Sequence, residues 1–157
     1  MKKYLIVFLI SMVPLIELRG AIPYAVGFNL PTIPSYVIAV IGNMIPVPFI
    51  FLFARKILEW GKDRKFIGGF FTWCLEKGEK GGEKIRKKAG RGVYIALLLF
   101  VGIPLPGTGA WTGTLAASFL NLDFRKSALY VMCGVVLAGV IMLAASFGVF
   151  GAIRFFN

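Results

Sequence analysis

Three long stretches without a single charged residue limit what this 157-residue chain can fold into. They cover residues 20–54, 92–122 and 127–153, and they are 35, 31 and 27 residues long. A helix crosses the hydrocarbon core of a bilayer with about 20 apolar residues, and a soluble domain of this size cannot bury three such segments in its own core. The sequence therefore predicts an all-α integral membrane protein, with residues 1–157 forming a single membrane domain.

Two of the apolar segments are too short to cross a bilayer as single helices. Residues 4–16 and 93–105 both contain 13 residues, and a helix of that length measures about 20 Å against about 30 Å of hydrocarbon. Each segment runs into a Pro/Gly sequence that breaks helices, and a second short apolar segment follows. We expect two helical hairpins and two spanning helices, at residues 4–30 and 93–122 and near residues 32–54 and 127–151.

The two halves of the chain follow the same order of segments. Pro14-Leu15 precedes Pro104-Leu105 by 90 residues, and Asn29-Leu30 precedes Asn121-Leu122 by 92 residues. Repeats with paired broken segments are typical of secondary transporters. We therefore predict two repeats, at residues 1–54 and 92–157, joined by a basic amphipathic connector at residues 55–91.

The broken segments can either cross the membrane completely or enter and leave it on the same side. Full crossing gives four spans. Re-entry gives each repeat one span and one re-entrant hairpin, and the two repeats are then inverted relative to one another. The length of the 13-residue helices favours re-entry, with the two hairpin tips meeting near the middle of the bilayer.

The connector carries most of the net charge of +11. Residues 55–91 contain 12 Lys or Arg and 5 Asp or Glu, and aromatic side chains alternate with the charges in their first half. This pattern is typical of an interfacial helix and of a loop kept in the cytoplasm by its positive charge. We expect a multi-pass protein of the cell membrane, and we expect no nucleic-acid binding, because no groove-reading or stacking motif accompanies the basic residues.

The first break contains a carboxylate and a guanidinium. Glu17 and Arg19 are two residues apart, so they lie on different faces of a regular helix, but at a break they can converge. A charge deep in a bilayer costs at least about 2.5 kcal/mol and is usually paired or turned to a cavity. One interpretation is a site in which Arg19 binds an anion while Glu17 carries a proton or positions Arg19. The alternative is that both residues lie at the headgroups and only end a helix.

The second break predicts an anion site of a different kind. A new helix is expected to begin near residues 108–110, with its free N–H groups and positive dipole end turned to the membrane interior. The alternative is a Pro/Gly kink with Thr108 as an ordinary N-cap. Asn29 and Asn43, single polar residues among apolar ones, are expected to form hydrogen bonds between helices. The candidate substrate-binding residues of the two breaks are Glu17, Arg19, Gly20, Pro104, Pro106, Gly107, Thr108, Gly109, Trp111 and Thr112.

Residues suited to catalysis or metal binding are scarce. The chain contains no histidine, and Cys74 and Cys133 stand apart from each other. No pair of nucleophile and base is visible. We therefore expect no enzyme activity, no catalytic residues, no metal and no cofactor.

The two breaks together resemble the small multidrug export family. The resemblance rests on Glu17-Leu18-Arg19-Gly20-Ala21-Ile22-Pro23 and on the stretch from Gly102 to Gly113, and it covers nearly the whole chain. It implies a fold shared with the DedA superfamily, which has two inverted repeats with re-entrant hairpins and whose members are implicated in moving lipids across bilayers. In that superfamily an arginine closely follows the Pro-Gly turn of the second hairpin. Here Thr108 follows Pro106-Gly107, so only Arg19 is placed to bind an anion.

These features predict a membrane transporter or lipid flippase that moves an anionic lipid or small molecule, with proton or other ion coupling. The alternatives are an exporter of cationic drugs and a membrane protein that binds partners through its basic connector. Membrane lipids and a second copy of the chain are further expected partners.

Overall fold

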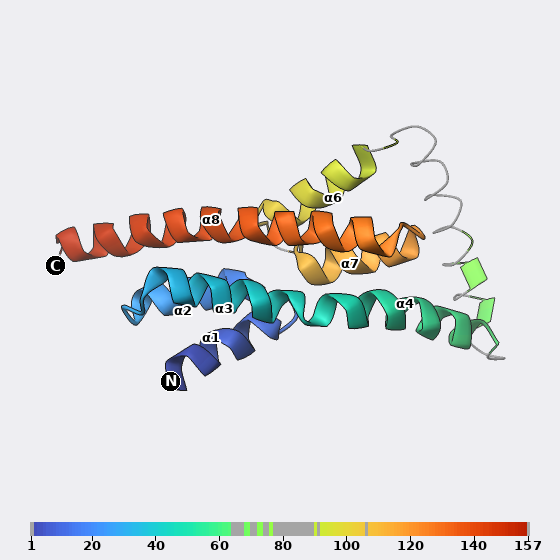
Figure 1. The fold of residues 1–157 in the computed structure, drawn as a ribbon, viewed down its shortest axis with the longest axis horizontal. Helices are drawn as coiled ribbons and strands as arrows, with labels where there is room; N and C mark the ends of the chain where they lie inside the picture. Colours follow the sequence, from blue (N-terminus) through green and yellow to red (C-terminus); the bar gives the residue numbers. More distant parts are fainter. Residues whose placement is uncertain are drawn as a thin grey trace.

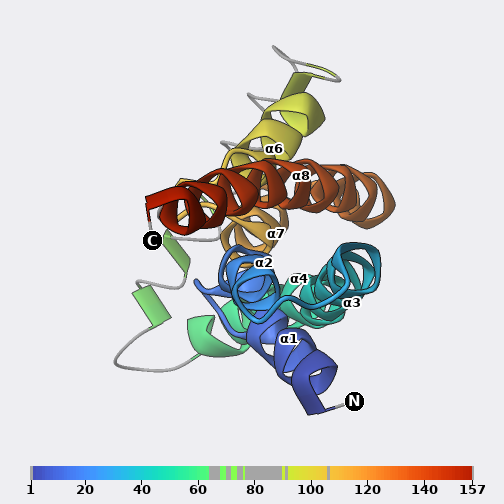
Figure 2. The same cartoon turned by 90° about the vertical axis from the view of Figure 1, so that its left-hand side faces the viewer.

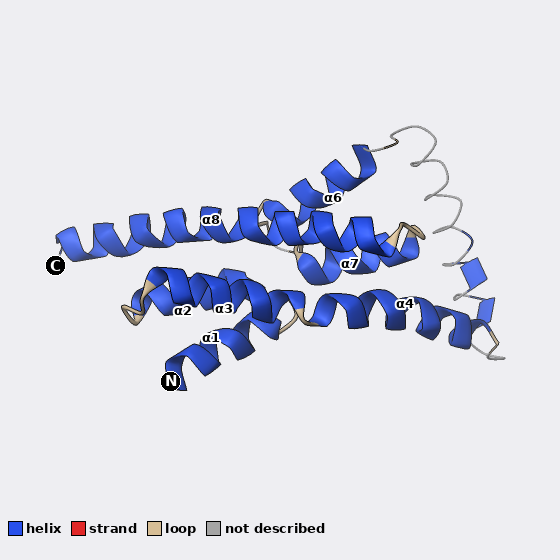
Figure 3. Cartoon of the chain, viewed as in Figure 1, coloured by secondary structure: helices blue, strands red, loops and turns tan. Residues whose placement is uncertain are grey.

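The computed structural model describes residues 2–63, 68–69, 72–73, 76, 90, 92–105 and 107–156. All regular secondary structure in these residues is helical (Figures 1 and 3), which confirms the predicted all-α class. Two stretches, Thr32–Ala54 and Phe124–Ala152, are long and apolar enough to cross a membrane, as expected. The helices are α1 (Lys2–Met12), α2 (Glu17–Gly27), α3 (Thr32–Met44), α4 (Pro46–Lys62), α6 (Gly92–Gly102), α7 (Ala110–Phe119) and α8 (Phe124–Phe156).

The four short helices form two hairpins that approach the middle of the molecule from opposite ends. Helix α1 begins and helix α2 ends on the side of the two termini, whereas α6 begins and α7 ends on the opposite side (Figure 1). Each of these helices has 10 or 11 residues, which corresponds to about 16 Å of length. The turns that join them lie next to each other in the centre.

Each hairpin is connected to the spanning stretch that follows it, α3–α4 or α8, by the same type of turn. After α2, the N–H of Asn29 bonds to the carbonyl of Val26, and that of Leu30 to the carbonyl of Ala25. After α7, 92 residues later, Asn121 and Leu122 bond in the same pattern to Ser118 and Ala117. Both asparagines have a φ of 52°, because this helix-ending motif needs a left-handed residue and asparagine adopts that conformation more readily than most.

The long helices pack against the hairpins through small residues. Gly42 of α3 lies against α1, where an added Cβ would be 2.8 Å from the carbonyl oxygen of Phe8. Gly134 of α8 lies against α6 in the same way, 2.7 Å from that of Leu98. The second helix of each hairpin packs across the molecule, α2 against α8 and α7 against α4. Seen end-on, α2 and α7 are therefore enclosed between the long helices (Figure 2).

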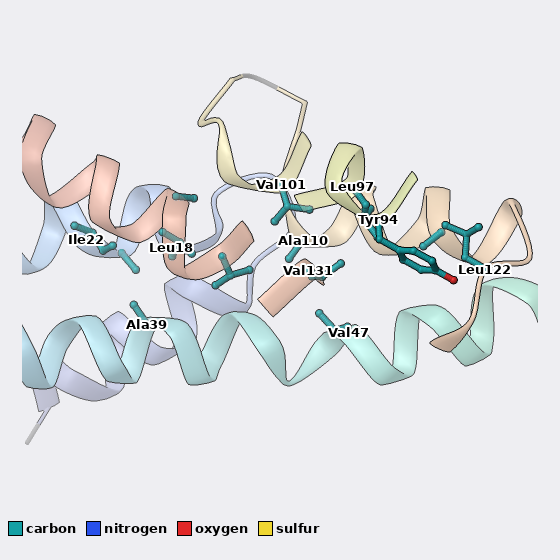
Figure 4. Close-up of a cluster of buried hydrophobic side chains, with 14 of the residues drawn as sticks. Leu18, Ile22, Ala39, Val47, Tyr94, Leu97, Val101, Ala110, Leu122 and Val131 are labelled. Carbon is teal, nitrogen blue, oxygen red and sulfur yellow. The ribbon is translucent and has the colours of Figure 1, made fainter. Parts of the chain in front are cut away.

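The core contains mostly Ala, Val and Leu side chains, and it extends along the molecule from Ile22 and Ala39 past Ala110 to Leu122 (Figure 4). The outer surface is also apolar, with Ile33 77% exposed and Phe49 59% exposed. Large exposed apolar areas are unusual for a soluble monomer, and they fit the hydrocarbon of a bilayer.

The first spanning stretch is interrupted in its middle. Helix α3 ends at Met44 and α4 begins at Pro46, because Pro46 and Pro48 have no N–H to donate to the preceding turn. Helix α4 then continues to Lys62, into the sequence expected to form the connector. The part of the connector after residue 63 lies largely outside the described residues.

Candidate functional site

The carboxylate of Glu17 occupies the N-terminus of α7. Its Oε2 accepts the N–H of Ala110 at 3.2 Å, and its Oε1 accepts the N–H of Trp111 at 3.0 Å. The side chain is buried, with 3% of its surface exposed. Free N–H groups and the helix dipole both favour negative charge at this position. The N-terminus of α7, where the sequence predicts an anion site, therefore holds a carboxylate from the other half of the chain.

The guanidinium of Arg19 binds the turn that precedes α7. Its Nη1 donates to the carbonyl oxygen of Leu105, and its Nη2 donates to Thr108 Oγ1 at 2.8 Å and to the carbonyl oxygen of Ile103 at 3.4 Å. The Thr108 hydroxyl lies 2.9 Å and 3.0 Å from the same two carbonyl oxygens. One planar cation thus holds three acceptors of the second hairpin.

Glu17 and Arg19 therefore bind different parts of the second hairpin, and their described hydrogen bonds do not join them to each other. The two side chains converge, as expected, on one region of the second hairpin. Arg19 binds the turn before α7, and Glu17 binds the first residues of α7. The acceptors and donors are mainly backbone groups, of Ile103, Leu105 and Ala110. Backbone groups occur at every position, so no residue pattern could have identified them.

Gly109 makes the close approach of Glu17 possible. It is the N-cap residue of α7, and its φ is 140°, in the region where side chains are strongly disfavoured. A Cβ at this position would lie 2.7 Å from Glu17 Cδ and Oε1, and closer still to Oε2. The alternative interpretation of this turn had Thr108 as the N-cap residue of α7. The structure corrects it, because the N-cap residue is Gly109.

The first break holds an unusual backbone conformation. Leu15 and Glu17 have φ values of 69° and 52°, which non-glycine residues adopt at a cost of about 1 kcal/mol or more. Such residues persist only where the surrounding structure holds them. The two hydrogen bonds from α7 to the carboxylate constrain Glu17, the second of these residues.

The remaining candidate residues contribute less to this arrangement. Thr112 Oγ1 lies 3.4 Å from the carbonyl of Gly109 in its own helix. Gly20 lies against Ile16 within the first hairpin. The Trp111 side chain lines an apolar groove of about 310 Å³ between α4 and α7, together with Phe49 and Leu115. Pro104 and Gly107 belong to the turn that Arg19 holds, and Pro106 lies outside the described residues.

Asn43 does not form the hydrogen bonds between helices that were expected of it. Neither its Nδ2 nor its Oδ1 forms a hydrogen bond with the residues that the structure describes, although the side chain is 1% exposed. The hydroxyl of Thr114, on α7, is equally buried and equally without a described partner. Sequence reasoning had not selected Thr114, because threonine is common in apolar helices.

In the part of the chain that the structure describes, the regular elements are all helices, two stretches are able to cross a bilayer, and two hairpins are joined through Glu17 and Arg19. The family described as "Putative small multi-drug export protein" matches residues 17–141, and the chain belongs to this family of membrane transport proteins. The match confirms the family resemblance seen in the sequence, and it includes Glu17, Arg19 and the whole of the second break. No curated protein and no solved structure matches the chain.

Proposed function

We propose that this protein is a transporter or lipid flippase in which a substrate anion exchanges with the Glu17 carboxylate at the start of α7. The observation that carries the proposal is the pair of hydrogen bonds from Ala110 and Trp111 to Glu17. A phosphate or carboxylate group of a substrate has the same acceptor chemistry as Glu17. The internal carboxylate thus occupies the place that we assign to the substrate.

Arg19 is the second element of the proposed site. Its planar guanidinium suits a phosphate, because it can form two parallel hydrogen bonds with two oxygens. Its present acceptors are two carbonyl oxygens and one hydroxyl, which are neutral groups. An anion that arrives beside Thr108 would compete with them by its charge.

Proton coupling follows from this exchange. A substrate anion and a charged Glu17 repel each other in the same small space, so Glu17 has to be neutral when substrate binds. A neutral carboxyl group also binds the two N–H groups of α7 less strongly than a carboxylate does. One proton bound by Glu17 therefore accompanies one anion bound at α7.

We expect transport of an anionic lipid or small molecule to rise as the pH falls and to become independent of pH in Glu17→Gln. The amide is neutral at every pH, so it leaves the N–H groups of α7 equally available throughout. A step that needs one proton changes by at most about tenfold per pH unit. Flux into liposomes, measured at several pH values with a fluorescent lipid phosphate, checks this expectation.

The same liposomes test the alternative that the family description favours, export of cationic drugs. Movement of a cationic dye without movement of the lipid phosphate would contradict the proposed anionic substrate and support export of cationic drugs. A protein that moves neither, but binds other proteins through residues 55–91, would support the role of the basic connector as a docking surface. We propose neither an enzyme activity nor a cofactor for any of these functions.

The membrane arrangement that we propose has inverted repeats with re-entrant hairpins at α1–α2 and α6–α7, as in the DedA superfamily. Three observations support it: the short helices, the shared turn at Asn29 and Asn121, and the approach of the hairpins from opposite ends (Figure 1). In the cell membrane, the connector would then face the cytoplasm because of its positive charge. A second copy of the chain and membrane lipids are the partners that we expect.

We expect an impermeant thiol reagent added outside cells to label Lys3→Cys and Asn157→Cys but not Arg125→Cys. The parent for these variants has Cys74 and Cys133 replaced by serine and serves as the unlabelled control. Protection of residues 3 and 157, together with labelling of residue 125, would instead support four complete spans. Labelling after permeabilisation checks that each introduced cysteine is reactive.

A further inference from the structure

An unpaired amide lies at the centre of the first spanning stretch. Asn43 is midway along the 23-residue stretch Thr32–Ala54, and only 1% of its surface is exposed. Its Nδ2 and Oδ1 have no hydrogen-bond partner in the described part of the chain. A buried polar group without partners is costly, above all inside a bilayer, where such residues usually have a function.

The packing of α7 against α4 and of α2 against α3 brings the middle of the first spanning stretch next to the junction of the two hairpins. Ser118 Oγ donates to the carbonyl oxygen of Phe51 at 2.8 Å, and the two helices lie side by side and run in the same direction (Figure 1). Eight residues earlier in each segment are Ala110 and Asn43. Ala110 is the residue whose N–H binds Glu17.

The Asn43 side chain also lies on the inner face of its helix. Ala39, one turn before it in α3, is buried, and so is Val47 at the start of α4. Figure 4 shows these two side chains in the cluster that contains Leu18 and Ala110. Residues four apart share a helix face, so Asn43 lies on the same side of α3 as Ala39, and α3 packs against α2, which begins at the first break.

The chemistry of an amide identifies the partner that it lacks. An asparagine side chain offers N–H donors on one side and an acceptor oxygen on the other. A carboxylate can only accept hydrogen bonds, whereas a protonated carboxyl group both donates and accepts. The neutral form of a nearby carboxyl group therefore matches both unpaired atoms of Asn43 at once, and a metal cation would match only the oxygen.

We propose that Asn43 receives the side chain of Glu17 when Glu17 is protonated. Glu17 takes a proton from a hydronium ion of the aqueous phase: one O–H bond of the hydronium ion breaks, an O–H bond of the carboxyl group forms, and water is left. The hydrogen bonds from Ala110 and Trp111 are released. The new O–H then donates to Asn43 Oδ1, and the carboxyl C=O accepts from Nδ2. The reverse step returns the proton to water and the carboxylate to α7. The inference rests on the proposed function and adds where the side chain of protonated Glu17 lies, namely against Asn43.

Few other charged or titratable groups can influence this step. Apart from Glu17 itself, Arg19 is the sole charged residue in residues 4–54, 92–122 and 127–153. On the helices packed against α2, Tyr36 of α3 donates its hydroxyl to the carbonyl of Val136 at 2.8 Å. Lys2, Lys3 and Tyr4 are at the start of α1. The sequence of α8 completes the list of such groups with Arg125, Lys126, Tyr130, Cys133 and Arg154.

A double-mutant cycle read out by thermal unfolding tests the proposal in the purified full-length protein. Glu17→Gln mimics the protonated form, because its amide also has one donor side and one acceptor side. At alkaline pH, Asn43→Leu should raise the Tm of the wild-type protein, since it replaces an unpaired amide with an apolar side chain. In the Glu17→Gln background the same substitution should lower the Tm, because it removes the hydrogen-bond partner of the amide introduced at position 17. We expect shifts on the order of 3 °C in opposite directions.

Thr114→Val is the matched control. It removes another buried and unpaired polar group from the same region, so its effect on the Tm should be the same in both backgrounds. An equal Tm shift for Asn43→Leu in both backgrounds would overturn the assignment of Asn43. The pH dependence of flux tests the transport function separately, so a failure of one proposal can be told from a failure of the other.

Discussion

Gly109→Ala is expected to separate the Glu17 carboxylate from α7 and to cause the largest loss of stability of any single methyl group added at this junction. The new Cβ would lie 2.7 Å from Glu17 Cδ and Oε1, so the carboxylate would have to move. Each hydrogen bond to a charged group contributes about 1.5–3 kcal/mol, and strain at a φ of 140° adds about 1–3 kcal/mol. We expect a loss of about 3 kcal/mol or more.

Gly107→Ala is the control that isolates the contact with Glu17. Gly107 lies in the same turn with a φ of 80°, but a Cβ there would meet nothing within 4 Å. This variant should therefore lose only the part due to backbone strain, about 1 kcal/mol. Thermal unfolding of the detergent-purified variants measures the difference. Equal losses for the two alanine variants would mean that the Glu17 contact contributes nothing to stability.

Arg19→Lys is expected to lose most transport, by about tenfold or more, while it keeps the charge. The guanidinium reaches Leu105, Ile103 and Thr108 together because its donors form a planar fork. A lysine ammonium is a single point on a flexible stem, and it cannot reproduce that geometry for the turn or for a substrate phosphate. Flux into liposomes, normalised to the amount of reconstituted protein, measures the effect.

Arg125→Lys provides the comparison for this substitution. Arg125 is exposed at the start of α8, away from the two breaks, so its variant should transport at the wild-type rate. Arg19→Ala extends the series, because it leaves the carbonyl groups of Ile103 and Leu105 without their cation. Normal expression and wild-type transport by Arg19→Ala would show that Glu17 and Arg19 serve only to end a helix.

The helical segments of this protein could be predicted because they depend on local composition. A run of apolar residues forms a helix in a bilayer whatever surrounds it, since its backbone groups must be satisfied within the segment. Proline breaks a helix through its own missing N–H, and asparagine favours the left-handed turn through its own side chain. The predicted breaks, the corners at Asn29 and Asn121, and the start of α7 near residue 110 are therefore where the sequence placed them.

The partners of the charged and polar side chains could not be predicted in the same way. Glu17 and Arg19 were recognised as unusual, but their partners are backbone groups 84 to 94 residues away, and every residue offers such groups. Asn43 was expected to form hydrogen bonds between helices. Only the packing of the helices shows that its amide is buried without a described partner.

The sequence by itself thus determined that this chain is a helical membrane protein and where its helices break. Only the tertiary structure decided that the carboxylate of one half closes the helix N-terminus of the other, because that choice depends on which backbone groups packing leaves unpaired. Close approach at Gly109 and the fork of Arg19 then select one arrangement among many that the residue pattern allows. The physical reason is distance: helix formation is local, whereas the pairing of buried charges depends on contacts between distant segments.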